Sequence, residues 1–216
     1  MSSPRIEDIN WALDTMKVLV SHDIYQAATR EDYRTTISFW CDEHHELLHE
    51  MGLQVAAGCT KVCIIDEEEE FVIKFDIVDK CCGASYCDLE SRNYKMAVEA
   101  GLGRWFAGTW EVGEVAGRMV YLQQYARTDE DATSDSFYDY ICENYYDGQN
   151  DEETQDSIAC SVDEMDNEDR IYAMIGYDHD ASKVVDFCDQ WDINDLHAGN
   201  WGYINDEAVM IDYSGY

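Results

Sequence analysis

The final 25 residues of the sequence hold the residue types and spacing that are most suggestive of chemistry. Asp195 and Asn200 lie five residues apart in a polar loop, and Asp212 directly follows a short apolar run, Ala208-Val-Met-Ile211. Asp195 could accept a proton from a hydroxyl group, while the side-chain oxygens of Asn200 and Asp212 suit Mg²⁺ bound to nucleotide phosphates. The alternative is an ordinary loop and strand, because Asp and Asn are common turn formers.

A lysine lies inside an apolar strand further upstream. Residues 71–78 alternate in the manner of a buried strand, and Lys74 interrupts the apolar side chains. A lysine in such a strand needs an acidic partner or a polar opening; an edge strand with Lys74 pointing to solvent is the alternative. The helical pattern of residues 87–106 starts with Asp88 and Glu90, two acidic residues that stabilise the first turn of a helix.

Three segments together resemble the protein-kinase-like superfamily. Asp195-Leu-His-Ala-Gly-Asn200 is similar to the catalytic loop of small-molecule kinases, Asp212-Tyr-Ser-Gly to the Asp-Phe-Gly segment, and residues 71–78 to the Val-Ala-Ile-Lys strand. The resemblance spans residues 53–215, and the compact chain is similar to uncharacterised phage-encoded proteins of this kind. It implies an α+β fold with two lobes, extra N-terminal helices and a truncated, mostly helical C-lobe.

The resemblance implies a phosphotransferase that uses Mg-ATP on an acceptor that the sequence does not identify. Asp195 would be the catalytic base, and Lys74 would hold the α- and β-phosphates. Glu90, with Glu99 as the second choice, would pair with Lys74. The metal ligands would be Asn200 and Asp212.

The same resemblance implies nucleotide contacts in the strands and in the hinge that follows them. Gly58 through Thr60 would cover the phosphates, and Val62 would contact the adenine. The hinge at Gln124 and Tyr125 would bind the adenine through backbone hydrogen bonds. Four features depart from the family pattern. One glycine stands where the phosphate loop usually has three, and Ile193-Asn194 replaces the His-Arg that precedes the catalytic Asp. Asp212-Tyr-Ser replaces Asp-Phe-Gly, and the sequence ends four residues after Asp212, without an activation segment.

The charge of the chain is strongly negative, with 47 acidic against 14 basic residues and a formal net charge of −33. Residues 128–169 contain 16 Asp and Glu and no Lys or Arg. This sign disfavours direct nucleic-acid binding, which depends on neutralising phosphates. The acidic surface can instead imitate DNA. The alternative to a phosphotransferase is therefore an idle kinase-like scaffold that inhibits a basic, nucleic-acid-binding host protein, such as a defence or restriction enzyme. A solvated surface or adaptation to high salt would also explain the charge.

A second metal-binding pattern lies near the N-terminus. His45-Glu46-Leu-Leu-His49 matches the motif of zinc peptidases, in which two histidines on one helix face bind zinc and the glutamate is the general base. Glu50 follows the second histidine where those enzymes usually carry an uncharged residue. His44 and Glu43 favour a simple polar helix face instead, and the sequence offers no evident third ligand. Metal binding by this motif therefore stays open.

Periodicity and turn residues divide the chain into an N-terminal helical extension (1–52), a sheet-containing lobe with the hinge (53–126) and an acidic C-lobe (127–216). The further predicted elements are helices over 7–27, 30–51, 136–146, 167–177 and 181–191, strands over 53–57, 61–65 and 110–126 with a turn at Ala116-Gly117, and a loop over 147–156. The sequence has no signal-peptide pattern and no apolar run of about 18 residues. Its nine cysteines are irregularly spaced. We therefore expect a soluble, reduced, cytoplasmic protein (host cytoplasm if viral) that does not associate with membranes.

Overall fold

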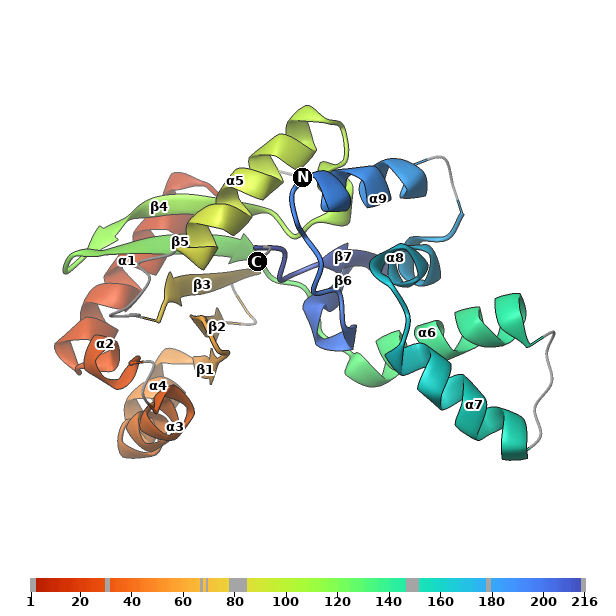
Figure 1. Ribbon diagram of the computed structural model, residues 1–216. Coiled ribbons are helices and arrows are strands. Elements are labelled where there is room, and N and C mark those ends of the chain that lie inside the picture. Colours follow the sequence, from red (N-terminus) through yellow and green to blue (C-terminus); the bar gives the residue numbers. More distant parts are fainter. Residues whose placement is uncertain are drawn as a thin grey trace. The chain divides into compact units, whose positions relative to one another are not determined.

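The computed structural model describes residues 3–29, 32–66, 68, 70–77, 85–146, 152–177 and 180–214. The fold is α+β, as expected, and the chain divides into two compact units (Figure 1). Unit 1 comprises residues 1–95 and 107–125, and unit 2 comprises residues 96–106 and 126–216. The helices predicted as an N-terminal extension therefore belong to the same unit as the sheet.

The two long helices predicted near the N-terminus each divide in two. The helices of unit 1 are α1 (Ile6–Ser21), α2 (Ile24–Ala27), α3 (Tyr33–Glu43), α4 (His45–Met51) and the first ten residues of α5 (Tyr86–Glu99), whose last four residues belong to unit 2. Asp23 separates α1 from α2 with a φ of 64°, a left-handed conformation that Asp tolerates better than most residues. Gly52, with a φ of 67°, ends α4 as its position in the sequence predicted.

The strands of unit 1 form one antiparallel sheet of five strands in the order β1-β2-β3-β5-β4. They are β1 (Gln54–Ala57), β2 (Lys61–Asp66), β3 (Phe71–Asp76), β4 (Thr109–Val115) and β5 (Arg118–Gln124), which confirms the predicted strands. Ala116 and Gly117 join β4 to β5 with φ values of 49° and 85°. Two positive φ values in a two-residue loop are the geometry that best fits the twist of a hairpin.

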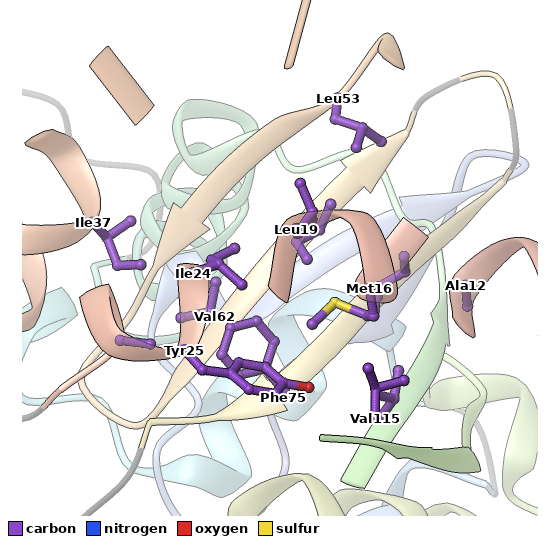
Figure 2. Packing of buried hydrophobic residues seen from close by; sticks show 14 of the residues in the cluster. Ala12, Met16, Leu19, Ile24, Tyr25, Ile37, Leu53, Val62, Phe75 and Val115 are labelled. Carbon is purple, nitrogen blue, oxygen red and sulfur yellow. The ribbon is translucent and has the colours of Figure 1, made fainter. Parts of the chain in front are cut away.

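The sheet has an apolar face that packs against the N-terminal helices. Val62 pairs with Phe75 across β2 and β3, and Ile64 pairs with Ile73. These side chains are fully buried in a cluster that also contains residues of α1 to α4 (Figure 2). The ring of Tyr25 contacts that of Phe75 edge to face, with 5.0 Å between their centroids. The N-terminal helices are therefore part of the core on which the sheet depends.

Unit 2 consists of helices and a small hairpin. Its elements are α6 (Glu130–Tyr145), α7 (Glu152–Asp163), α8 (Asn167–Ile175), α9 (Ala181–Gln190), two short 3-10 turns, η1 (Gly103–Trp105) and η2 (Ala198–Asn200), and strands β6 (Trp201–Ile204) and β7 (Glu207–Met210). Part of the loop predicted over 147–156 is instead the start of α7, while residues 147–151 lie outside the described residues. No helix in the described ranges is long and apolar enough to cross a membrane.

Three buried aromatic rings form a centre of unit 2. Phe106 contacts Phe187 and Tyr213, with ring centroids 5.5 and 5.2 Å away. Segment 126–127 also runs beside β6, where Arg127 and Tyr203 exchange two backbone hydrogen bonds. A Cβ on Gly202 would lie 2.8 Å from the Cβ of Ala126, so this close approach requires glycine.

We predict that replacing Leu19 with alanine lowers the free energy of unfolding by about 3 kcal/mol, because Leu19 is fully buried in the core shared by α1 and the sheet. Val18 is the next residue of the same helix and is 38% exposed. Val18→Ala should therefore change the free energy by about 0.5 kcal/mol or less. Urea denaturation of both variants measures this difference, and equal losses would contradict the core described above.

Candidate functional site

The carboxylate of Glu90 binds two buried lysines in unit 1. Lys74 Nζ lies 3.2 Å from Glu90 Oε2, and Lys61 Nζ lies 2.6 Å from Glu90 Oε1. The side chain of Glu90 is fully buried, and each lysine side chain is 6% exposed. The Lys74–Glu90 contact is the pairing that the kinase-like resemblance implies. The catalytic roles of both residues remain predictions.

Sequence reasoning missed Lys61. The register of the sheet pairs Lys74 with Cys63, and Lys61 lies two residues before Cys63 on β2. Successive side chains of a strand point to opposite faces, so these three share the face opposite to the apolar core. The alternation of Lys61-Val62-Cys63-Ile64 already places Lys61 and Cys63 on one face of the strand. Only the register between β2 and β3 shows that this face also carries Lys74.

The end of β3 holds the start of α5 in place. Asp76 accepts hydrogen bonds from the backbone N–H of Cys87 at 3.0 Å and from Ser85 Oγ at 2.8 Å. Ser85 Oγ accepts in turn from the N–H of Asp88 at 3.1 Å. Helix N-termini have unsatisfied N–H groups, and these side chains satisfy two of them. Glu90 follows one turn later and is thereby directed toward the lysines.

Cys87 lies beside this cluster and is fully buried. Burial raises the pKa of its thiol well above the usual range, and the nearby carboxylates of Asp76 and Glu90 act in the same direction. The thiol is therefore neutral at neutral pH and packs as a small apolar group. A neutral, buried thiol of this kind is a poor nucleophile.

The loop of unit 2 that carries Asp195 is tied down by its own side chains. Asn200 Nδ2 donates to the backbone oxygen of Asp195 at 2.5 Å, and Trp201 Nε1 donates to that of Leu196 at 3.2 Å. Ile193 and Leu196 flank the aspartate and are buried. The side chain of Asp195 is 46% exposed. The carboxylate thus stands on a fixed loop within reach of solvent.

Asn200 and Asp212 are linked through the hairpin of unit 2. Trp201 pairs with Met210 in the ladder, and the N–H of Ile211 donates to the oxygen of Asn200 at 2.9 Å. This bond extends the ladder by one pair, Asn200 with Ile211, and Asp212 is the next residue after that pair. Tyr213 is fully buried and anchors the segment.

The donor atoms of this pair suit a hard cation. The amide nitrogen of Asn200 is committed to Asp195, which places its oxygen on the other side of the amide group. Asp212 is half-buried, and its Oδ1 accepts from Ser214 Oγ at 3.2 Å. Mg²⁺ is commonly held by one or two such oxygen ligands together with waters and substrate phosphates. These residues therefore fit Mg²⁺ better than zinc, which prefers nitrogen and sulfur.

The predicted contact between Val62 and adenine is wrong. Val62 is fully buried in the core against the N-terminal helices. A shift of one residue along a strand moves a side chain to the opposite face, so Cys63 and Val72 are the residues that share the face of Lys74.

The predicted phosphate loop is a tight turn in the structure. The N–H of Gly58 donates to the oxygen of Lys61 at 2.9 Å, and the oxygen of Thr60 accepts from the N–H of Ile77 at 2.7 Å. A Cβ on Gly58 would lie 3.9 Å from the nearest atom, so glycine is not required for space. The N–H of Gly58 thus closes the turn and cannot also bind a phosphate.

The predicted hinge uses its N–H groups within unit 1. The N–H of Gln124 donates to the oxygen of Gly108 at 2.8 Å, and that of Tyr125 donates to the oxygen of Glu70 at 2.7 Å. These N–H groups are therefore not available to adenine, and an adenine bound here would have to donate its own hydrogen bond to an acceptor or contact a side chain. The buried Oε1 of Gln124 has no hydrogen-bond partner among the described residues, and it is an acceptor of this kind.

The histidine motif lies on α4, which has seven residues. His45, Glu46 and His49 are exposed. No group of three or more His, Cys, Asp or Glu in the described residues could hold a metal ion. His49 lines a depression of about 430 Å³ together with Asp66 and Glu68. Carboxylates in this depression disfavour a phosphate ligand.

Comparison with models of known protein families, with curated proteins and with solved structures gives no match. The resemblance to kinases therefore rests on the motifs of the sequence alone.

We predict that Glu90→Ala lowers the free energy of unfolding by about 3–5 kcal/mol, because it leaves two buried ammonium groups without their shared carboxylate. Glu99, the second choice from the sequence, is exposed on the same helix. Glu99→Ala should change the free energy by about 0.5 kcal/mol or less. Chemical denaturation measures both. A loss for Glu90→Ala as small as that for Glu99→Ala would show that the charge cluster does not stabilise the fold.

Proposed function

We propose that this protein is a phosphotransferase that uses Mg-ATP and has a kinase-like two-lobed arrangement. The observation that carries the proposal is the buried contact between Lys74 and Glu90. A strand lysine held by a glutamate from the following helix is the arrangement that positions nucleotide phosphates in kinases. Apolar packing does not require charges there, and burying them has a substantial desolvation cost.

Each residue has a defined task under this proposal. Lys74 would bind the phosphates, and Glu90 would keep its ammonium group in place. Asp195 would accept the proton of the acceptor hydroxyl, since it stands at the surface of a loop that its neighbours hold rigid. Asn200 and Asp212 would hold Mg²⁺. When bound, the metal would offset the negative charge of the phosphate oxygens.

The net charge of −33 opposes the approach of ATP, so the binding residues must act at short range. Buried ammonium groups do so, because charges interact more strongly where water is excluded. The two lysines bound to Glu90 thus supply the positive charge for the phosphates that the acidic surface of the chain does not provide. Repulsion from the exposed carboxylates is screened by salt beyond about 10 Å at 0.1 M.

We predict that ATP binds in a Mg²⁺-dependent manner and that Asp212→Ala weakens this binding at least about tenfold, because a metal ligand is lost. Glu207 is an exposed carboxylate on the same hairpin, and Glu207→Ala is the matched control, with no expected change. Calorimetric titration with ATP, with and without Mg²⁺, measures the effect. Absence of binding at millimolar ATP would refute the phosphotransferase proposal.

A second candidate function is supported by the surface of residues 128–169. Of the eleven acidic side chains that are described in this segment, nine are exposed: Glu130, Asp131, Asp135, Asp139, Glu143, Asp163, Glu164, Asp166 and Glu168. Tyr145 is also 61% exposed, and tyrosine rings bind guanidinium groups well. We propose as the alternative that this acidic surface binds a basic, nucleic-acid-binding host protein, as a mimic of DNA.

We predict that this surface binds a ten-residue arginine peptide at 0.15 M salt and that reversing three charges on one face of α6, in Asp135→Lys, Asp139→Lys and Glu143→Lys together, removes the binding. The control reverses three exposed carboxylates of unit 1, at Asp42, Glu43 and Glu46. Both variants change the net charge equally. Fluorescence anisotropy measures the affinity, and equal losses would indicate a general charge effect instead of a docking surface.

A further inference from the structure

We propose that Lys61 is a second phosphate-binding residue of the nucleotide site and shares this role with Lys74. The inference rests on the proposed phosphotransferase function and adds a residue to it. Lys61 and Lys74 come from neighbouring strands and bind different oxygens of one carboxylate, at 2.6 and 3.2 Å. The two ammonium groups thus bind the same carboxylate group, each at hydrogen-bond distance from one of its oxygens.

Glu90 binds both ammonium groups through different oxygens. Each of its oxygens is bound by one lysine, so neither lysine can be regarded as the single partner of the helix. Both side chains lie on the sheet face opposite to the apolar core, as the pairing of Lys74 with Cys63 shows. Any polyphosphate that reaches Lys74 would therefore lie beside Lys61 as well.

The turn before β2 gives a reason for a second lysine. In a glycine-rich loop, backbone N–H groups bind the phosphates, but here the N–H of Gly58 donates to the oxygen of Lys61. Lys61 is the first residue of β2 after this turn. A positive side chain at the end of the turn can bind phosphate oxygens where the backbone donor is used internally. Charge on a side chain thus takes the place of a phosphate loop.

A phosphate-binding role of Lys61 and a purely positioning role predict different results when Lys74 is also replaced. Either role changes the affinity for ATP and ADP but not for adenosine, which has no phosphate, because Glu90 also holds Lys74. A Lys61 that only positions Glu90 would act through Lys74, so its loss would add nothing in a chain that already lacks Lys74. A Lys61 that binds phosphate itself would weaken ATP binding further in that chain. The comparison of the double variant with Lys74→Met therefore separates the two roles.

The experiment is calorimetric titration of the wild type, Lys61→Met, Lys74→Met and the double variant with Mg-ATP, ADP and adenosine. Methionine keeps most of the length of the side chain and removes its charge. We expect each single variant to bind ATP and ADP about tenfold more weakly and adenosine with unchanged affinity, and the double variant to lose ATP binding. Lys95→Met, at an exposed position of α5, is the control and should match the wild type.

Labelling of the wild type provides a test that does not depend on the folding of a variant. An acyl-phosphate derivative of ATP transfers its acyl group to amines beside the phosphates, and mass spectrometry locates the modified lysines. We expect both Lys61 and Lys74 to be modified, and ATP to prevent both modifications. Modification of Lys74 without Lys61, or an unchanged ATP affinity in Lys61→Met, would overturn this inference and leave the phosphotransferase proposal intact. Absence of ATP binding by the wild type would overturn both.

Discussion

The charged side of the sheet depends on the carboxylate of Glu90. Its two oxygens bind ammonium groups from two neighbouring strands, and all three side chains are almost entirely removed from solvent. Charges in such a place are tolerated where each is paired and hydrogen-bonded, and removing one partner is far more costly than removing an exposed ion pair. The cluster therefore fixes where α5 lies along β2 and β3, and Asp76 reinforces the same placement from the start of the helix.

The sheet of unit 1 combines two different environments on its two faces. One face is apolar and packs on the N-terminal helices, whereas the other carries the lysines. Because successive side chains alternate, Lys61 and Val62 are adjacent in sequence but belong to opposite environments. The core and the candidate site are thus built by the same strands, and a change in strand register would disturb both.

In unit 2, the residues that could take part in catalysis are themselves held in place by packing and hydrogen bonds. Asn200 ties the loop to Asp195 through its amide nitrogen, and its backbone oxygen joins the loop to the end of β7. The buried ring of Tyr213 holds the segment that carries Asp212. Groups that hold a cation or accept a proton need such rigid support, because small displacements weaken both functions. The residues that form the support lie immediately beside the functional candidates in the sequence.

The sequence by itself determined the class of the fold, the strands of the sheet and the choice of Lys74, because alternation, helical periodicity and a lysine in an apolar strand are local signals. The choice of Glu90 came from the resemblance to kinases. It also placed the Ala116-Gly117 turn, which depends on backbone preferences of two residues. Tertiary structure alone decided the rest. The face on which Val62 and Lys61 lie, the second lysine on Glu90 and the internal use of the hinge N–H groups all follow from strand register and hydrogen bonds between segments distant in sequence. Such pairings are set by the packing of the whole unit, and no short stretch of residues encodes them.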